Sequence, residues 1–311
     1  MPLSLETPDY MRLLPPQTLG RIGRLELVAR GLVEGFVTGR HKSPFKGASV
    51  EFAEHRQYVP GDDTRTLDWR LYGKTDRYYV KQFVEETNMR VTIVLDASGS
   101  MGYAGDKAAK LDGKPASKFA YAQHLAAALT YLLVHQQDAV GLVTFDTETR
   151  RYFPARARAS QVRILLEELN QTHPGKETAA AEILHDIAER IPRRGLVIVI
   201  SDLFDDVAEI VRALHHFRYR KHEVLLLHVM ADEELTFPFE KWSDFRDLEM
   251  PASHAQLDPK AVRAAYLAGV EHFLKELEIG CGRMKVDYVP LNTKEPYDIA
   301  LADFLADRKG R

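Results

Sequence analysis

The sequence predicts an α/β protein built on a doubly wound, mostly parallel six-stranded sheet with one antiparallel edge strand. From residue 90 onward, short runs rich in β-branched residues alternate with helical patterns, which is typical of a parallel sheet with helices on its faces. One pair of runs is joined only by the short turn at 146–148, which predicts a hairpin and therefore an antiparallel strand. The expected strands are 91–95, 139–145, 150–153, 196–201, 223–229 and 285–289.

Helices are expected where apolar residues recur at helical spacing between these runs. They are 117–136, 160–169, 178–190, 207–217, 259–277 and 297–305. Asp258 and Pro259 begin the fifth of them as an N-cap and a first helical residue do, and Gly280 follows its predicted end.

The N-terminal part of the chain has a different pattern. Residues 21–38 have a helical repeat, and glycines and prolines then punctuate short runs such as 49–52 and 78–83. This predicts an N-terminal helix plus a small β-rich unit, with Trp69 as its buried anchor. The expected domains are 1–89 for the helix and the small unit, and 90–311 for the sheet.

Composition excludes several classes of protein. Lys and Arg total 42 against 45 Asp and Glu, a net charge of −3, which lacks the basic excess of nucleic-acid-binding proteins. The single cysteine, Cys281, excludes an intrachain disulfide and a thiolate metal cluster. No apolar run reaches the roughly 18 residues of a membrane span, and no signal peptide is evident. We therefore expect a cytoplasmic protein with no membrane span and no nucleic-acid partner.

The first strand leads into Asp96, Ser98 and Ser100, a carboxylate and two hydroxyls at the carboxyl end of a strand. Ligands of open α/β sheets bind at that edge. Asp, Ser and Gly are also common in turns and helix caps, so this motif alone leaves a structural role open. Following the chain direction through the predicted elements places Thr178 and Asp202 at the same edge.

These five side chains offer two carboxylates and three hydroxyls, without histidine or cysteine. Such hard oxygen ligands favour Mg²⁺, Mn²⁺ or Ca²⁺ over zinc or copper. Because Mg²⁺ prefers near-octahedral coordination, an incomplete protein shell leaves a position for water or for a ligand from outside. The sequence therefore predicts a divalent-cation site with an open position.

The pattern Asp96-x-Ser98-x-Ser100, with Thr178 and Ser201-Asp202, resembles the metal-ion-dependent adhesion site of von Willebrand factor A-type domains. Further segments are similar to the signature segments of a bacterial family catalogued as domain of unknown function fifty-eight, often encoded beside MoxR-type AAA+ ATPases. They are Ser49-Val50-Glu51-Phe52, Arg56-x-Tyr58-x-Pro60-Gly61-Asp62-Asp63, Arg65-x-x-Asp68-Trp69, Lys81-x-Phe83, Phe237-Pro238-Phe239 and Thr293-x-x-Pro296. The resemblance covers about residues 40–305.

The resemblance implies a non-catalytic, divalent-metal-dependent protein-interaction module. It implies that Ser98, Ser100 and Thr178 contact the cation, and that Asp96 and Asp202 bind it directly or through water. A MoxR-type ATPase and an unidentified client protein are the implied partners, and a partner's acidic side chain would complete the metal shell. One departure from the family pattern is Lys176-Glu177 before Thr178, where glycines are common.

A second interpretation is a Mg²⁺-dependent phosphohydrolase of haloacid-dehalogenase type. Asp96 would be its nucleophile, and Asp202 with Asp206 would imitate its distal acidic pair. That motif has an acidic residue two positions after the nucleophile, where this chain has Ser98, which cannot protonate a leaving group at neutral pH. The chemistry of the residues therefore favours the interaction module.

Overall fold

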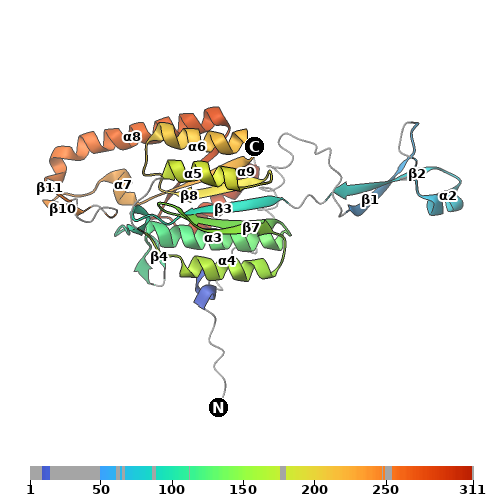
Figure 1. Cartoon of the computed structure of the whole chain (residues 1–311), viewed down its shortest axis with the longest axis horizontal. Helices are drawn as coiled ribbons and strands as arrows, with labels where there is room; N and C mark the ends of the chain where they lie inside the picture. The colour runs from blue at the N-terminus through green and yellow to red at the C-terminus, as the bar shows by residue number, and fades with distance from the viewer. Residues whose placement is uncertain are drawn as a thin grey trace, which may run out of the picture. The chain divides into compact units, whose positions relative to one another are not determined.

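The computed structural model describes residues 9–14, 50–60, 64, 67–85, 89–111, 113–175, 180–246, 248 and 254–309. The chain divides into two compact units, Arg40–Asn88 and a larger unit of Met1–Gly39 with Met89–Arg311 (Figure 1). The described segment 9–14 packs with the sheet, whereas the predicted division placed it with the small unit. The physical reason is that Leu13 and Leu14, at the end of the 3-10 helix η1 (Asp9–Leu13), are buried in the core of the larger unit. The helix predicted at 21–38 lies outside the described residues.

The larger unit contains the predicted six-stranded sheet, with strand order β12-β9-β8-β3-β6-β7. Every neighbouring pair is parallel except β6 and β7, so the predicted von Willebrand factor A-like, doubly wound fold with one antiparallel edge strand is confirmed. The strands are β3 (Arg90–Asp96), β6 (Ala139–Phe145), β7 (Thr149–Arg156), β8 (Leu196–Ser201), β9 (Glu223–Met230) and β12 (Asp287–Asn292).

Helices cover both faces of this sheet, which explains why its central strands are continuous apolar runs. Figure 1 shows α3 and α4 on one face and α5, α6 and α8 on the other, and α9 packs with the core on the α3 side. The helices are α3 (Lys118–His135), α4 (Ser160–Gln171), α5 (Ala180–Arg190), α6 (Val207–Tyr219), α8 (Pro259–Met284) and α9 (Tyr297–Lys309).

Helix α8 begins where the sequence predicts, because the Asp258 carboxylate accepts a hydrogen bond from the amide of Lys260. The predicted end at 277 is wrong, since Gly280 lies inside the helix. A Cβ on Gly280 would lie 2.5 Å from Cγ2 of Val211, so glycine allows close packing of α8 on α6. The glycine serves helix packing instead of helix termination.

Short elements that the sequence analysis missed surround the carboxyl edge of the sheet. They are η3 (Ser100–Gly102), β4 (Lys110–Leu111), β5 (Lys114–Pro115), α7 (Asp232–Thr236), β10 (Ser243–Arg246) and β11 (His254–Leu257). The two-residue and four-residue strands are too short for a clear period in the sequence. No helix within the described ranges is long and apolar enough to span a membrane.

The small unit has two strands at the predicted short runs, β1 (Val50–Gln57) and β2 (Tyr79–Glu85), and they pair antiparallel. It also has a helix that was not predicted, α2 (Trp69–Thr75). Asp68 begins α2: Oδ1 accepts hydrogen bonds from the amides of Arg70 and Leu71. Its other oxygen, Oδ2, lies 2.9 Å from Nε2 of His55 in β1. One carboxylate therefore caps the helix and links it to the strand.

Trp69 is not the buried anchor that the sequence analysis expected, because it is 63% exposed. It lies on the first turn of α2, and its ring contacts Tyr72 edge to face at 6.3 Å. Tyr72 in turn stacks on Tyr78 at 4.6 Å. Trp69, Tyr72 and Tyr78 thus form a partly exposed aromatic cluster on α2 and the segment before β2.

We predict that Trp69→Ala leaves the stability of the protein nearly unchanged, within about 0.5 kcal/mol, as for most exposed positions. Thermal unfolding of the variant beside the wild type measures this. A loss of several kcal/mol would mean that Trp69 is buried in the native protein.

Candidate functional site

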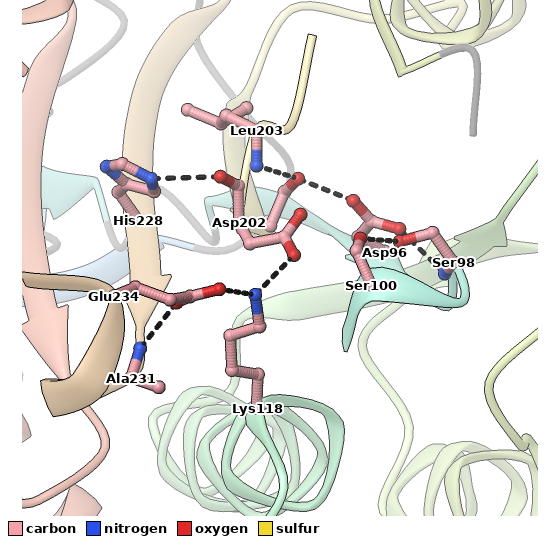
Figure 2. Close-up of polar contacts among 10 residues, drawn as sticks. Asp96, Ser98, Ser100, Lys118, Asp202, Leu203, His228, Ala231 and Glu234 are labelled. Atoms are coloured by element: carbon pink, nitrogen blue, oxygen red, sulfur yellow. Dashed lines mark hydrogen bonds and ion pairs between the residues drawn. The ribbon is translucent and has the colours of Figure 1, made fainter. Parts of the chain in front are cut away.

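The site is built around Asp96, the last residue of the central strand β3. The Asp96 side chain is fully buried, and its Oδ1 accepts a hydrogen bond of 2.9 Å from the amide of Ser98. The hydroxyls of Ser98 and Ser100 lie 3.0 Å apart. Asp202 follows β8, the neighbouring parallel strand, and Figure 2 shows its carboxylate beside these three residues. Four of the five predicted ligands therefore lie together at one edge of the sheet.

Ser201 fixes this arrangement, although the sequence analysis gave it no role of its own. Its hydroxyl donates a 2.5 Å hydrogen bond to Oδ2 of Asp96 and accepts one of 2.9 Å from the amide of Leu203. Leu203 has a φ of 52°, a left-handed conformation that is unfavourable for a branched side chain. The hydroxyl thus orients the Asp96 carboxylate and stabilises the tight turn that carries Asp202.

Lys118, at the start of α3, is a second residue that the sequence analysis missed. Its side chain is 3% exposed, and its Nζ lies 2.8 Å from Oδ2 of Asp202 and 2.5 Å from Oε1 of Glu234 (Figure 2). The other oxygen of Glu234 accepts a hydrogen bond from the amide of Ala231. Burial alone would lower the pKa of Lys118, but the negative charges of Asp202 and Glu234 raise it by a larger amount. The net pKa of Lys118 therefore lies above its usual range. The ammonium is therefore a fixed positive charge at this edge.

His228 in β9 holds the main chain of Asp202. Its Nε2 lies 3.0 Å from the carbonyl oxygen of Asp202, and its Nδ1 lies 2.9 Å from the hydroxyl of Tyr288. Burial lowers the pKa of His228 to about 4, so the ring is neutral. Because a carbonyl oxygen only accepts, Nε2 carries the proton and Nδ1 accepts from Tyr288.

The electrostatics of the site favour a cation. Burial, and then the charge of Asp202, raise the pKa of Asp96 to about 7, against the opposing hydrogen bonds from Ser201 and Ser98. A divalent cation between the two carboxylates would oppose both causes. The ammonium of Lys118 reaches Oδ2 of Asp202, but the buried Oδ1 has no hydrogen-bond partner within the described part of the chain.

The donors present fit a hard divalent cation. Oδ1 of Asp202, the Asp96 carboxylate and the hydroxyls of Ser98 and Ser100 are all oxygen donors of the kind Mg²⁺ prefers. The described residues contain no group of three or more His, Cys, Asp or Glu side chains able to hold a metal. A cation here would therefore depend on the serine hydroxyls as well as on the carboxylates.

Thr178, the fifth predicted ligand, lies outside the described residues. The described residues on either side of it contact the two loops of the site. The amide of Gly175 donates a 2.6 Å hydrogen bond to the carbonyl oxygen of Ala97, and the amide of Ala181 donates one of 3.1 Å to Oδ2 of Asp205.

Two cavities open beside these residues, and both are lined by Lys118, Phe204 and Glu234. One, of about 400 Å³, reaches Ser100 and is bounded by Arg246 and His254 of the β10–β11 pair. The other, of about 510 Å³, reaches Asp202 and is bounded by α8. Phe204, which is 75% exposed, belongs to the walls of both. The site is thus accessible from two sides.

Comparison with known proteins gives one family match. A family model described as "Protein of unknown function DUF58" matches residues 54–273, a range that includes all five candidate ligands. The uncharacterized proteins Rv1480 of Mycobacterium tuberculosis (strain ATCC 25618 / H37Rv) and Mb1516 of Mycobacterium bovis (strain ATCC BAA-935 / AF2122/97) are similar to this chain. Each is 26% identical to it over 230 residues, which are 72% of this chain and 68% of the relative.

Two solved structures are also similar to this chain. The conserved hypothetical protein BatB from Bacteroides thetaiotaomicron has a TM-score of 0.46 at 21% identity, covering 72% of this chain and 100% of that one. An aerotolerance-related membrane protein from Bacteroides fragilis NCTC 9343 has a TM-score of 0.46 at 19% identity, covering 71% of this chain and 98% of that one.

Proposed function

Because the chain belongs to the DUF58 family, we propose that it is a non-catalytic, cytoplasmic protein-interaction module whose binding depends on a divalent cation. The observation that carries this proposal is the pair of Asp96 and Asp202 beside two serine hydroxyls, with a buried oxygen of Asp202 unpartnered in the described part of the chain. Mg²⁺ is the preferred ion, with Mn²⁺ and Ca²⁺ as alternatives. Ser98, Ser100, Asp96 and Asp202 would hold it, together with Thr178.

Bound there, the cation would supply a Lewis-acidic position for an oxygen ligand from a partner protein. The partner's ligand would approach the cation from the side of Ser100. Ser100 is only partly buried and lines the 400 Å³ cavity, whereas Asp96 and Ser98 are fully buried. Two basic side chains at the same cavity, Arg246 and His254, share the single carboxylate of Asp244, which leaves a place for a second anionic group. The partner group of this proposal is therefore an Asp or Glu side chain.

The surroundings of Asp96 do not favour the phosphohydrolase interpretation. A carboxylate that attacks a phosphorus needs room for a whole phosphate group at its oxygen, but the Asp96 side chain is fully buried. A small cation beside this carboxylate needs no such room. Asp206 would be the second residue of the distal acidic pair in that interpretation. It instead begins α6, where its Oδ1 accepts hydrogen bonds from the amides of Ala208 and Glu209.

The partner that we propose is a MoxR-type AAA+ ATPase, through which the module would act on a client complex. The support for this partner is the family membership alone. The test is copurification of the full-length chain with the MoxR-type ATPase encoded nearest to it, in millimolar Mg²⁺ and in excess EDTA. A complex that forms in Mg²⁺ and dissociates in EDTA supports the proposal, and a complex indifferent to EDTA contradicts it.

Reversing the charge of Arg246 tests the direction of partner approach. We expect Arg246→Glu to weaken the Mg²⁺-dependent complex about tenfold, because a carboxylate beside the cavity repels an acidic partner residue. Folding should not change, since Arg246 is exposed and pairs only with Asp244 among the described residues. Titration calorimetry of the complex measures the effect.

The matched control is Arg193→Glu, which reverses an exposed charge in the loop before β8, at the amino end of the strand. It should leave the affinity within about twofold, because exposed charges on opposite edges are separated by more than a Debye length. Equal losses from both variants would indicate a general charge effect instead of an approach through the cavity.

A further inference from the structure

The 510 Å³ cavity beside Asp202 has mostly apolar walls that the cation site does not use. Its volume lies within the roughly 300–1,000 Å³ of typical ligand pockets. Phe204, Met230 and four residues of α8 with apolar surfaces supply much of the wall; the four are Ala265, Tyr266, Val270 and Phe273. Asp202 and Lys118 connect the cavity with the candidate cation site.

Helix α8 is held at both sides of this cavity and is hardly buried between them. Toward its N-terminus, Tyr266 donates a hydrogen bond to the carbonyl oxygen of Glu234 and packs on Phe237 at 4.5 Å. Toward its C-terminus, Gly280 packs closely on α6. Of its 26 residues only Pro259, Leu277 and Cys281 are buried. Figure 1 shows the N-terminal half of α8 extending past α6 toward α7 and the β10–β11 pair, so no helix among the described elements covers this half.

The polar groups of the cavity favour a neutral, apolar occupant. Asp202, Asp205 and Glu234 outnumber Lys118 among its lining residues, so a free anion would be repelled. Most of these groups are already paired: Lys118 with two carboxylates, Asp205 with the amide of Ala181, and both nitrogens of His228. An apolar side chain could therefore enter without breaking a hydrogen bond, provided that another contact brings it there.

We propose that this cavity receives a large apolar side chain, aromatic or branched aliphatic, that lies a few residues from the partner's cation-binding carboxylate. This inference rests on the proposed function, since the carboxylate brings the apolar side chain to the cavity. The carboxylate enters by way of Ser100 and the apolar side chain inserts beneath α8, with Phe204 between them. Recognition of both the carboxylate and the apolar side chain makes the module selective for the partner's sequence, which a lone acidic residue cannot do.

The structure offers a matched pair of variants for the test. Gly269 lines the cavity, and a Cβ added there would meet no atom within 4 Å, so Gly269→Phe fills the cavity without a clash of its Cβ. Gly282 lies in the same helix, is exposed, does not line the cavity, and also has no atom within 4 Å of an added Cβ. Gly282→Phe is therefore the control, and equal melting temperatures of the two variants show that both fold.

The experiment selects displayed random peptides on the immobilised full-length protein in millimolar Mg²⁺. We expect enriched peptides to carry Asp or Glu with an aromatic or branched aliphatic residue a few positions away. Replacing that apolar residue by Ala, or using Gly269→Phe protein, should weaken binding about tenfold or more, whereas Gly282→Phe should not. Binding should also shift the methyl resonances of Met230 and Val270, and the Ala-substituted peptide should not.

Acidic peptides without an apolar preference, or equal binding to Gly269→Phe and wild type, would overturn the cavity assignment and leave the proposed function standing. Peptides that bind as well in EDTA as in Mg²⁺ and need no acidic residue would contradict the proposed function. They would also contradict the proposal that the cation site and the apolar cavity bind one partner segment together.

Discussion

Lys118→Met should destabilise the metal-free protein by about 3–5 kcal/mol, the usual cost of removing one partner from a buried ion pair. Without the ammonium, the carboxylates of Asp202 and Glu234 face one another with no positive charge between them. Methionine keeps much of the volume of lysine, so the loss reports on charge more than on packing. Added Mg²⁺ should recover part of the stability, because a cation at Asp202 replaces some of the missing charge.

Chemical denaturation in EDTA and in Mg²⁺ measures both effects. The matched control is Lys107→Met, because Lys107 pairs with Asp232 at 3.0 Å but has a half-exposed side chain. It should cost less than about 1 kcal/mol. If the two variants lose the same stability, Lys118 does not have the buried role that its contacts indicate.

Ser201→Ala should cost about 2–3 kcal/mol, because it leaves two buried groups without their hydrogen bonds. One is Oδ2 of Asp96, a charged acceptor when the carboxylate is ionised, and the other is the amide of Leu203 in its left-handed turn. Denaturant unfolding measures the loss. Ser100→Ala is the matched comparison, since the Ser100 hydroxyl bonds only to Ser98 among the described residues and its loss should leave stability within about 0.5 kcal/mol.

Ser201→Ala should therefore change the stability of the site, whereas Ser100→Ala should change only its binding of the cation. If Ser201→Ala unfolds at the same denaturant concentration as the wild type, the hydroxyl is not what orients Asp96.

The sheet could be predicted from the sequence because its central strands are buried on both faces, which produces continuous apolar runs between helical patterns. Asp96, Ser98, Ser100 and Asp202 could also be placed together, since the carboxyl ends of parallel strands meet at one edge. Local pattern and chain direction carry this information. No tertiary contact had to be known.

Lys118 and Ser201 could not be assigned in the same way. Lysine in the first turn of a helix is ordinarily a solvated residue, and its partner Glu234 lies 116 positions away in the sequence. For Trp69 the prediction was wrong in the other sense: the residue was expected to be buried and is exposed. A large aromatic residue is usually buried, whereas Trp69 lies on an exposed turn of a seven-residue helix. Each of these outcomes depends on which elements meet in space, and no local pattern records that.

Asp96, Asp202 and the serine hydroxyls form the proposed divalent-cation site. Titration calorimetry of Mg²⁺ into the metal-free wild-type protein tests it most directly, with Ser100→Ala as the comparison. We expect saturable binding at one site, weakened by Ser100→Ala, and a stabilisation of about 2.7 kcal/mol when the free ion reaches 100 times its dissociation constant. No heat and no change in melting temperature at millimolar Mg²⁺, Mn²⁺ or Ca²⁺, or equal binding by the wild type and Ser100→Ala, would contradict it.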